Sequence, residues 1–193
     1  MESVAENGFL KHFRTKKMTY KIELDSDCHK SLSLFLLKDV QNAAEIKEMV
    51  VKGKLDCCVV KPCLISHPFQ IVVAANKAVV SKMQDKMTTR TLSTEILYNL
   101  SLSRNITQSL IKFGVGESDK NVLVIIIEES GENATDRTLS HFKGVVCPIE
   151  ELPKFSDEVL IKKTYKIKDA ELAVSSLTDS IVTRIVTRDF TSL

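Results

Sequence analysis

Hydrophobic and polar residues alternate strictly in two stretches near the start of the chain. In residues 18–24 the apolar side chains occupy every second position, and residues 31–37 repeat the pattern with Leu32, Leu34 and Leu36 on one side. Such alternation indicates strands with one buried face, and the polar segment between them is typical of a turn. We therefore predict a β-hairpin.

Further strands are predicted at four places along the chain. Residues 121–129 are apolar on both faces, which indicates a central strand. Residues 56–60 and 145–149 contain short apolar runs that predict two brief strands. In residues 161–168 apolar side chains again alternate with lysines and a threonine, so we predict a strand there as well.

Five stretches carry apolar residues at helical spacing. The predicted helices cover residues 42–53, 68–87, 105–114 and 169–188, and a further one begins at Thr91 or Ser93. Gly53 and Gly114 end two of them, and Pro68 occupies a first turn. Glu95 falls in the first turn of the helix after Thr91, where its charge favours the positive end of the helix dipole.

Together these elements predict one α+β domain, with a mixed and mostly antiparallel sheet and helices packed on it. We place the domain at residues 18–193, and residues 1–17 before it have the character of a basic, disordered leader. No apolar segment typical of a secretory signal occurs there, and a mitochondrial address or a phosphate-contacting arm stays open as an alternative role. The longest apolar run, Val122–Ile127, is far too short to cross a bilayer, so we expect no membrane partner.

The composition narrows the classes of function. A net charge of +2 is low for a dedicated nucleic-acid binder, so any contact with RNA should be local. The five cysteines contain no CxxC pair and follow no secretion signal, which predicts reduced thiols in the cytosol or nucleus. The four histidines are scattered, so we expect no metal site. Catalytic and cofactor motifs of the GxSxG, P-loop and HExxH types are absent from the sequence, so we expect neither an enzyme nor a cofactor.

The helix over residues 68–87 has an apolar stripe with a polar residue inside it, Asn76. The stripe consists of Phe69, Val72, Val73, Val79, Val80 and Met83. A buried amide without partners costs roughly 1–3 kcal/mol, so Asn76 is either tied to a neighbouring backbone or a polar group on the floor of a pocket. Small residues cover the back of the helix, where another backbone can approach closely; these are Ala74, Ala75 and Ala78.

The closing helix is apolar on two sides, which one small domain rarely needs. Its predicted core face carries Ala173, Val174, Leu177, Ile181 and Ile185. The second face carries Leu172, Val182, Val186 and Phe190. That face is either covered by a loop, left simply exposed, or used as a docking surface for another protein.

Several of these segments, taken together, resemble a known family. They are LLKDVQNAAEIK, PFQIVVAANKAV, MTTRTLSTEILYNLS and NITQSLIKFG. In order and spacing they are similar to the PRPK-binding protein (TPRKB) family, whose members are subunits of the KEOPS/EKC complex. The similarity extends from Met18 to Phe190 and is densest between Pro68 and Gly114.

The resemblance implies a non-catalytic protein of the cytosol and nucleus. Its partners would be the small atypical kinase of the complex, the other subunits indirectly, and tRNA. The complex attaches threonylcarbamoyl to the adenosine beside the anticodon, a transfer that another subunit performs. On this basis the kinase-binding residues would be Leu172, Val182, Val186 and Phe190, and the tRNA-binding residues would be Asn76, Lys77, Arg90 and Ser93.

Alternatives to these assignments stay open at the level of sequence. Arg90 could contact phosphate, or it could form a salt bridge to Glu95 or end in solvent. Tyr98 is the one aromatic residue of its segment that could stack on a base. The protein could also be an enzyme acting on a nucleotide or acyl group in a pocket around Asn76, or a kinase regulator without any role in RNA binding.

Overall fold

The computed structural model describes residues 19–24, 26–129 and 134–190, so the predicted leader at residues 1–17 lies outside the described part. A five-stranded sheet runs through the middle of the molecule. Its strands are β1 (Tyr20–Glu23), β2 (Lys30–Lys38), β3 (Cys58–Val60), β4 (Val122–Glu129) and β5 (Val145–Cys147). The order is β1-β2-β4-β3, with β5 also pairing with β2, and each of these pairings is antiparallel. The predicted α+β fold and the hairpin of β1 and β2 are confirmed.

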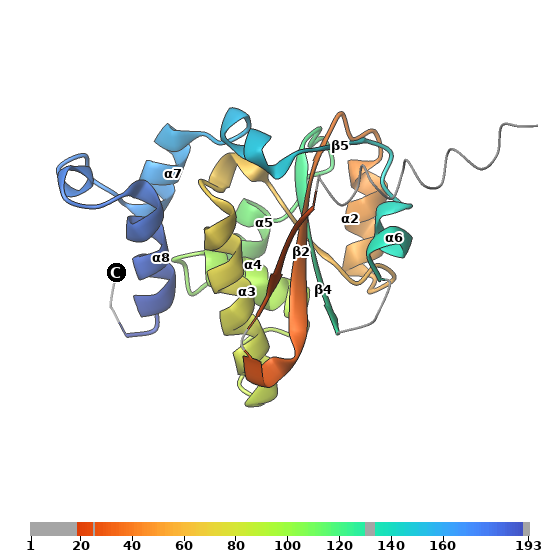
Figure 1. The fold of residues 1–193 in the computed structure, drawn as a ribbon, viewed down its shortest axis with the longest axis horizontal. Coiled ribbons are helices and arrows are strands. Elements are labelled where there is room, and N and C mark those ends of the chain that lie inside the picture. The colour runs from red at the N-terminus through yellow and green to blue at the C-terminus, as the bar shows by residue number, and fades with distance from the viewer. Residues whose placement is uncertain (1–18, 25, 130–133, 191–193) are drawn as a thin grey trace, which may run out of the picture.

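Helices cover both faces of the sheet (Figure 1). On one face lie α3 (Pro68–Met83), α4 (Leu92–Leu100), α5 (Ile106–Phe113), α7 (Glu158–Tyr165) and α8 (Leu177–Thr187). On the other face lie α2 (Ala43–Val51) and α6 (Ala134–Leu139). Short 3-10 turns link these elements at Ser26–Cys28, Pro62–Leu64, Ile149–Lys154 and Glu171–Ala173.

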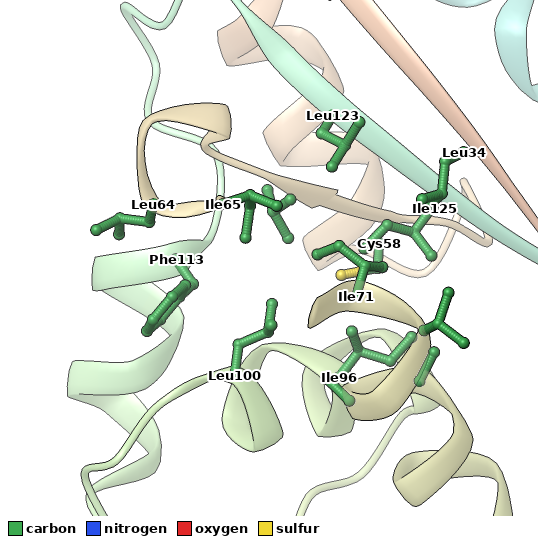
Figure 2. Close-up of a cluster of buried hydrophobic side chains, with 14 of the residues drawn as sticks. Leu34, Cys58, Leu64, Ile65, Ile71, Ile96, Leu100, Phe113, Leu123 and Ile125 are labelled. Carbon is green, nitrogen blue, oxygen red and sulfur yellow. The ribbon is translucent and has the colours of Figure 1, made fainter. Parts of the chain in front are cut away.

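Two hydrophobic cores follow from these layers, one on each face of the sheet. In the larger core the side chains of Leu34, Leu123 and Ile125 from the sheet meet Ile71 of α3 and Leu100 of α4 (Figure 2). Strand β2 was predicted to bury one face only, which is wrong. Its alternate side chains fill the second core beneath α2, so β2 is buried on both faces.

Residues 161–165 form the end of helix α7, so the strand predicted at residues 161–168 is wrong. Asp157 begins α7, and its carboxylate accepts a hydrogen bond from the backbone N–H of Leu160 at 2.9 Å. Ile161 and Tyr165 are both fully buried and stand four residues apart, a spacing that fits one face of a helix as well as one face of a strand. Lys166 then ends the helix in the left-handed conformation, with φ of 53°.

The closing helix is shorter than predicted. Helix α8 begins after Ser176, whose hydroxyl accepts from the backbone N–H of Asp179 at 3.0 Å. The preceding residues Ala173 and Val174 belong to a separate turn and are exposed, so their predicted place in the core is wrong. Ile181 and Ile185 are fully buried, as predicted.

Candidate binding surfaces

A groove of about 540 Å³ lies between α3, α8 and the end of β1. Its residues are Glu23, Leu24, Phe69, Val72, Val73, Asn76, Lys77, Val80, Ser81 and Val186. The side chains are mostly aliphatic or aromatic, and Phe69 and Val186 are 43% and 49% exposed. We call it the α3–α8 groove. An apolar hollow of this kind suits the apolar side chains of a partner protein.

Four residues of the apolar stripe of α3 line this groove, whereas Val79 is fully buried in the larger core. The alanine face of α3 is fully buried, because α4 packs closely against it. Asn99 of α4 donates to the backbone carbonyl of Ala74 at 3.3 Å, a contact that larger side chains would prevent. The close approach predicted from the alanines is therefore confirmed. Asn76 is half-buried and lines the groove.

The four residues predicted to bind a kinase do not form one face. Val182, Val186 and Phe190 follow the outer side of α8 and its end, and Phe190 is 88% exposed. Leu172 belongs to the turn before α8 and packs against the larger core, so its predicted place on the outer face is wrong. Val186 is the member of this set that lines the groove.

Polar contacts fasten the end of α8 to α3. The ammonium of Lys77 lies 2.6 Å from the carboxylate of Asp189 and donates to the carbonyl of Ile185 at 3.3 Å. Burial alone would raise the pKa of the Asp189 carboxyl, but Lys77 and Arg188 hold that pKa below its usual value. The ammonium of Lys77 is therefore already paired within the protein, and it is less available to a phosphate group than predicted.

Arg188, which no pattern in the sequence singles out, fastens α8 to α4. Its guanidinium is 4.1 Å from the centre of the Tyr98 ring and donates to the carbonyl oxygens of Tyr98 and Ser101, the latter at 2.8 Å. Those carbonyls end α4, where a cation is favoured by the helix dipole. Because Tyr98 is buried beneath Arg188, it cannot stack on a base as the sequence suggested.

Arg90 and Ser93 lie in a different hollow, of about 440 Å³, at the start of α4. Lys30 and Lys82 share that hollow, and Lys30 is paired with Glu129 at 2.7 Å. Arg90 is exposed, and its side chain makes no hydrogen bond or ion pair with another residue of the described ranges. The hollow has no lining residue in common with the α3–α8 groove, so the predicted tRNA-binding residues fall into two groups.

Glu95 has a role that the dipole argument missed. It is only 2% exposed, and its carboxylate accepts from the backbone N–H groups of Thr88 and Thr89 at 3.2 and 2.7 Å. The salt bridge considered between Arg90 and Glu95 does not occur. Thr91 caps α4 through a reciprocal pair of bonds with Thr94, each 3.2 Å long, which settles the predicted choice of capping residue. Arg90 is thus held at the rim of its hollow by a well-fastened loop.

Comparison with known proteins decides the family. The sequence model of "Kinase binding protein CGI-121" matches residues 37–189. The chain is 34% identical over 160 residues to "EKC/KEOPS complex subunit TPRKB" of Danio rerio, covering 82% of this chain and 91% of that protein. It is 27% identical over 162 residues to "EKC/KEOPS complex subunit CGI121" of Debaryomyces hansenii, covering 76% and 82%. The chain belongs to the CGI-121 family. The Schizosaccharomyces pombe subunit of the same name is 26% identical over 159 residues, covering 78% of this chain and 91% of that protein.

Membership of the CGI-121 family confirms the resemblance and the expected non-catalytic role. The alternative of an enzyme with a pocket around Asn76 is therefore wrong. The neighbouring thiols of Cys57 and Cys58 are buried, and burial raises the pKa of Cys57 to about 12 and that of Cys58 as well, so neither is a ready nucleophile. Within the described ranges no cluster of metal ligands occurs, and no helix there has the length and apolarity of a membrane span.

Proposed function

We propose that this chain, a non-catalytic kinase-binding subunit of the EKC/KEOPS complex, meets the kinase of that complex with the α3–α8 groove. The observation that carries the proposal is the half-exposed apolar side chain of Val186 opposite that of Phe69, on two helices that flank one hollow. Burying apolar surface contributes about 25 cal/mol per Å² to the free energy of binding, so covering this exposed groove would stabilise a complex. Phe190 and Val182 extend the same side of α8.

Substitution of Val186 by Glu tests the docking surface. A carboxylate at the centre of a buried interface would be desolvated without a partner, so kinase affinity should fall roughly a hundredfold or more. Val174→Glu is the matched control, because Val174 is 90% exposed and lies outside the groove. Ile181→Glu should instead unfold the domain, since Ile181 is fully buried.

Kinase affinity by calorimetry and thermal midpoints are measured for all three variants. Wild-type affinity in Val186→Glu would show that the groove is not the docking surface. An equal loss in Val174→Glu would show a general charge effect.

We also propose that the chain helps recruit tRNA for threonylcarbamoylation of the adenosine beside the anticodon. Arg90 supports this as an exposed cation, with Lys82 in the same hollow and Ser93 as a hydroxyl that can meet a base or phosphate. Lys77 and Lys82 are five residues apart on α3, about 7.5 Å along the helix axis. One extended RNA strand could therefore pass from the hollow of Arg90 towards Asn76 and Lys77, provided that Lys77 leaves Asp189.

The tRNA proposal has a matched pair of arginines for its test. Arg90 and Arg137 both begin the tetrapeptide RTLS, and both are exposed. Arg90→Glu should weaken tRNA binding with little change in folding, whereas Arg137→Glu should weaken it far less. With few phosphates contacted, the dependence of affinity on salt should be shallow. Equal binding by the wild type and Arg90→Glu would favour a kinase-binding role without RNA recruitment.

We further propose that the protein acts in the cytosol and nucleus, which imaging of the labelled protein would test.

A further inference from the structure

A second apolar hollow, of about 450 Å³, opens at the β3 edge of the sheet. We call it the edge pocket. Helices α2, α4 and α5, strand β3 and the loop after α5 contribute to it. It shares no lining residue with the α3–α8 groove, so a molecule bound here would not displace one bound there.

Aliphatic side chains from three helices and the edge strand make up most of the edge pocket. They are Val50, Val51, Val59, Leu97, Leu110 and Ile111. Val51 is 78% exposed and Ile111 is 70% exposed, and they stand on two different helices that flank the same hollow. Single exposed apolar residues need no explanation, but two that converge on an apolar pocket are typical of a recognition site.

The charged residues of the edge pocket are both cations, Lys47 and Lys61. The ammonium of Lys61 donates to the backbone carbonyl of Ile111 at 3.2 Å and pairs with no carboxylate of the described ranges. Lys47 lies 3.0 Å from Glu117, but Lys47 is partly exposed and Glu117 largely so, and such a solvent-accessible ion pair is weak and easily exchanged. The pocket therefore offers an aliphatic surface beside positive charge.

These features narrow the class of ligand. Nucleic-acid bases are usually held by stacking on aromatic rings or on arginine, and the edge pocket is lined by neither. Addition of an extended strand to β3 is also disfavoured, because the outer side of β3 is already bonded. The backbone N–H of Val115 donates to the carbonyl of Val59 at 3.2 Å, and the backbone N–H of Lys61 donates to the carbonyl of Phe113 at 2.9 Å.

We propose that the edge pocket binds a short segment of a partner protein, one that carries aliphatic side chains flanked by Asp or Glu. The aliphatic side chains enter between Val51 and Ile111, and the carboxylates meet Lys47 and Lys61. Its contribution is recognition through side chains and charge, and it acts independently of the α3–α8 groove. The protein thereby has a second docking surface besides the one proposed for the kinase.

A random-peptide display library selected against the full chain tests the proposal without assuming a partner. Selection should enrich aliphatic residues flanked by Asp or Glu, and a synthetic peptide of the consensus is then measured by fluorescence polarisation. Val51→Ser and Ile111→Ser should each lower the affinity for that peptide about tenfold, and Lys61→Glu should lower it at least as much. Val159→Ser is the matched control, because Val159 is 79% exposed and lies outside the pocket. Affinity for the kinase should stay unchanged in all four variants.

Each contrary outcome overturns the proposal in a distinct way. Enrichment of no such pattern, or equal peptide binding by Val51→Ser and wild type, excludes the site. If binding of a single-stranded oligoribonucleotide depends on Val51 and Lys61, and binding of the peptide does not, the pocket is an RNA site. Loss of kinase binding in Val51→Ser, with normal kinase binding in Val186→Glu, would show that the edge pocket binds the kinase and that the α3–α8 groove does not.

Discussion

Replacement of the buried Arg188 by Met should loosen the C-terminal end of α8. The Arg188 side chain is 4% exposed, and its guanidinium bonds to the carbonyls of Tyr98 and Ser101 while covering the Tyr98 ring. Met fills a similar volume but donates no hydrogen bond. The Ser101 carbonyl then loses its donor, and the Tyr98 carbonyl keeps only the backbone N–H of Ser101. Because these carbonyls end α4, they also lose a favourable charge at the negative end of the helix dipole.

The magnitude follows from opposing contributions. Two hydrogen bonds from a charged donor contribute about 1.5–3 kcal/mol each, and a cation above a ring adds roughly 1 kcal/mol or more. Removing the buried charge returns part of this, because Arg188 no longer has to be desolvated. We expect a net loss of about 2–3 kcal/mol of unfolding free energy, which lowers the thermal midpoint of a domain of this size by roughly 5–10 °C.

Thermal unfolding followed by circular dichroism measures the effect, with hydrogen exchange of α8 as a local readout. Arg188→Lys should recover part of the loss, since it keeps the charge but not the planar donor pair. Arg137→Met, at an exposed arginine, should change the stability by no more than about 0.5 kcal/mol. Arg188→Met should also weaken kinase binding, although it alters no residue of the groove. A midpoint equal to wild type would refute the argument, because the desolvation cost would then cancel the contacts.

Three further predictions concern single groups. Tyr165→Phe removes a buried hydroxyl that donates to a backbone carbonyl at 2.7 Å, so the unfolding free energy should fall by about 1–3 kcal/mol in chemical denaturation. The paired Arg184 lowers the pKa of Glu171 to about 2 through hydrogen bonds of 2.6 and 2.7 Å. Because that pKa is depressed on folding, Glu171→Gln should melt below wild type at neutral pH, and the difference should vanish as pH falls from 4.5 towards 2. In mass spectrometry after alkylation at neutral pH, the native protein should be labelled at the partly exposed Cys28 but not at Cys57 until it unfolds.

Sequence patterns predicted the fold where local and tertiary preferences agree. The apolar run of β4 is a central strand because both of its faces are covered, and Gly53 ends α2 because its φ of 66° suits glycine. The strand predicted at residues 161–168 is wrong because the spacing of Ile161 and Tyr165 fits the repeat of a helix as well as that of a strand. Only the cap at Asp157 distinguishes the two, and it lies outside the alternating segment.

The candidate binding residues were harder to predict, because their neighbours come from distant parts of the chain. Val186 could be placed on an outer face from helical spacing, and Arg90 at the start of a helix from its threonines. The ion pair of Lys77 with Asp189 joins residues more than a hundred positions apart, so no local pattern reveals that this cation is already engaged. Arg188 gave only the signal of a basic residue at a helix end, which does not show what it covers.

Helix α3 explains why a docking surface should exist on this fold at all. A helix that is apolar on most sides is usually buried on most sides, yet α3 packs its alanine face against α4 and turns much of its larger apolar surface, with Phe69 and Val80, towards the groove. The alanines are needed inside because only small side chains allow α4 to approach as closely as the bond from Asn99 to Ala74 requires. Phe69 and Val80 are then left partly exposed beside Val186 of α8. A partner that fills this groove completes the burial that the isolated domain leaves unfinished, which is why we place the kinase there.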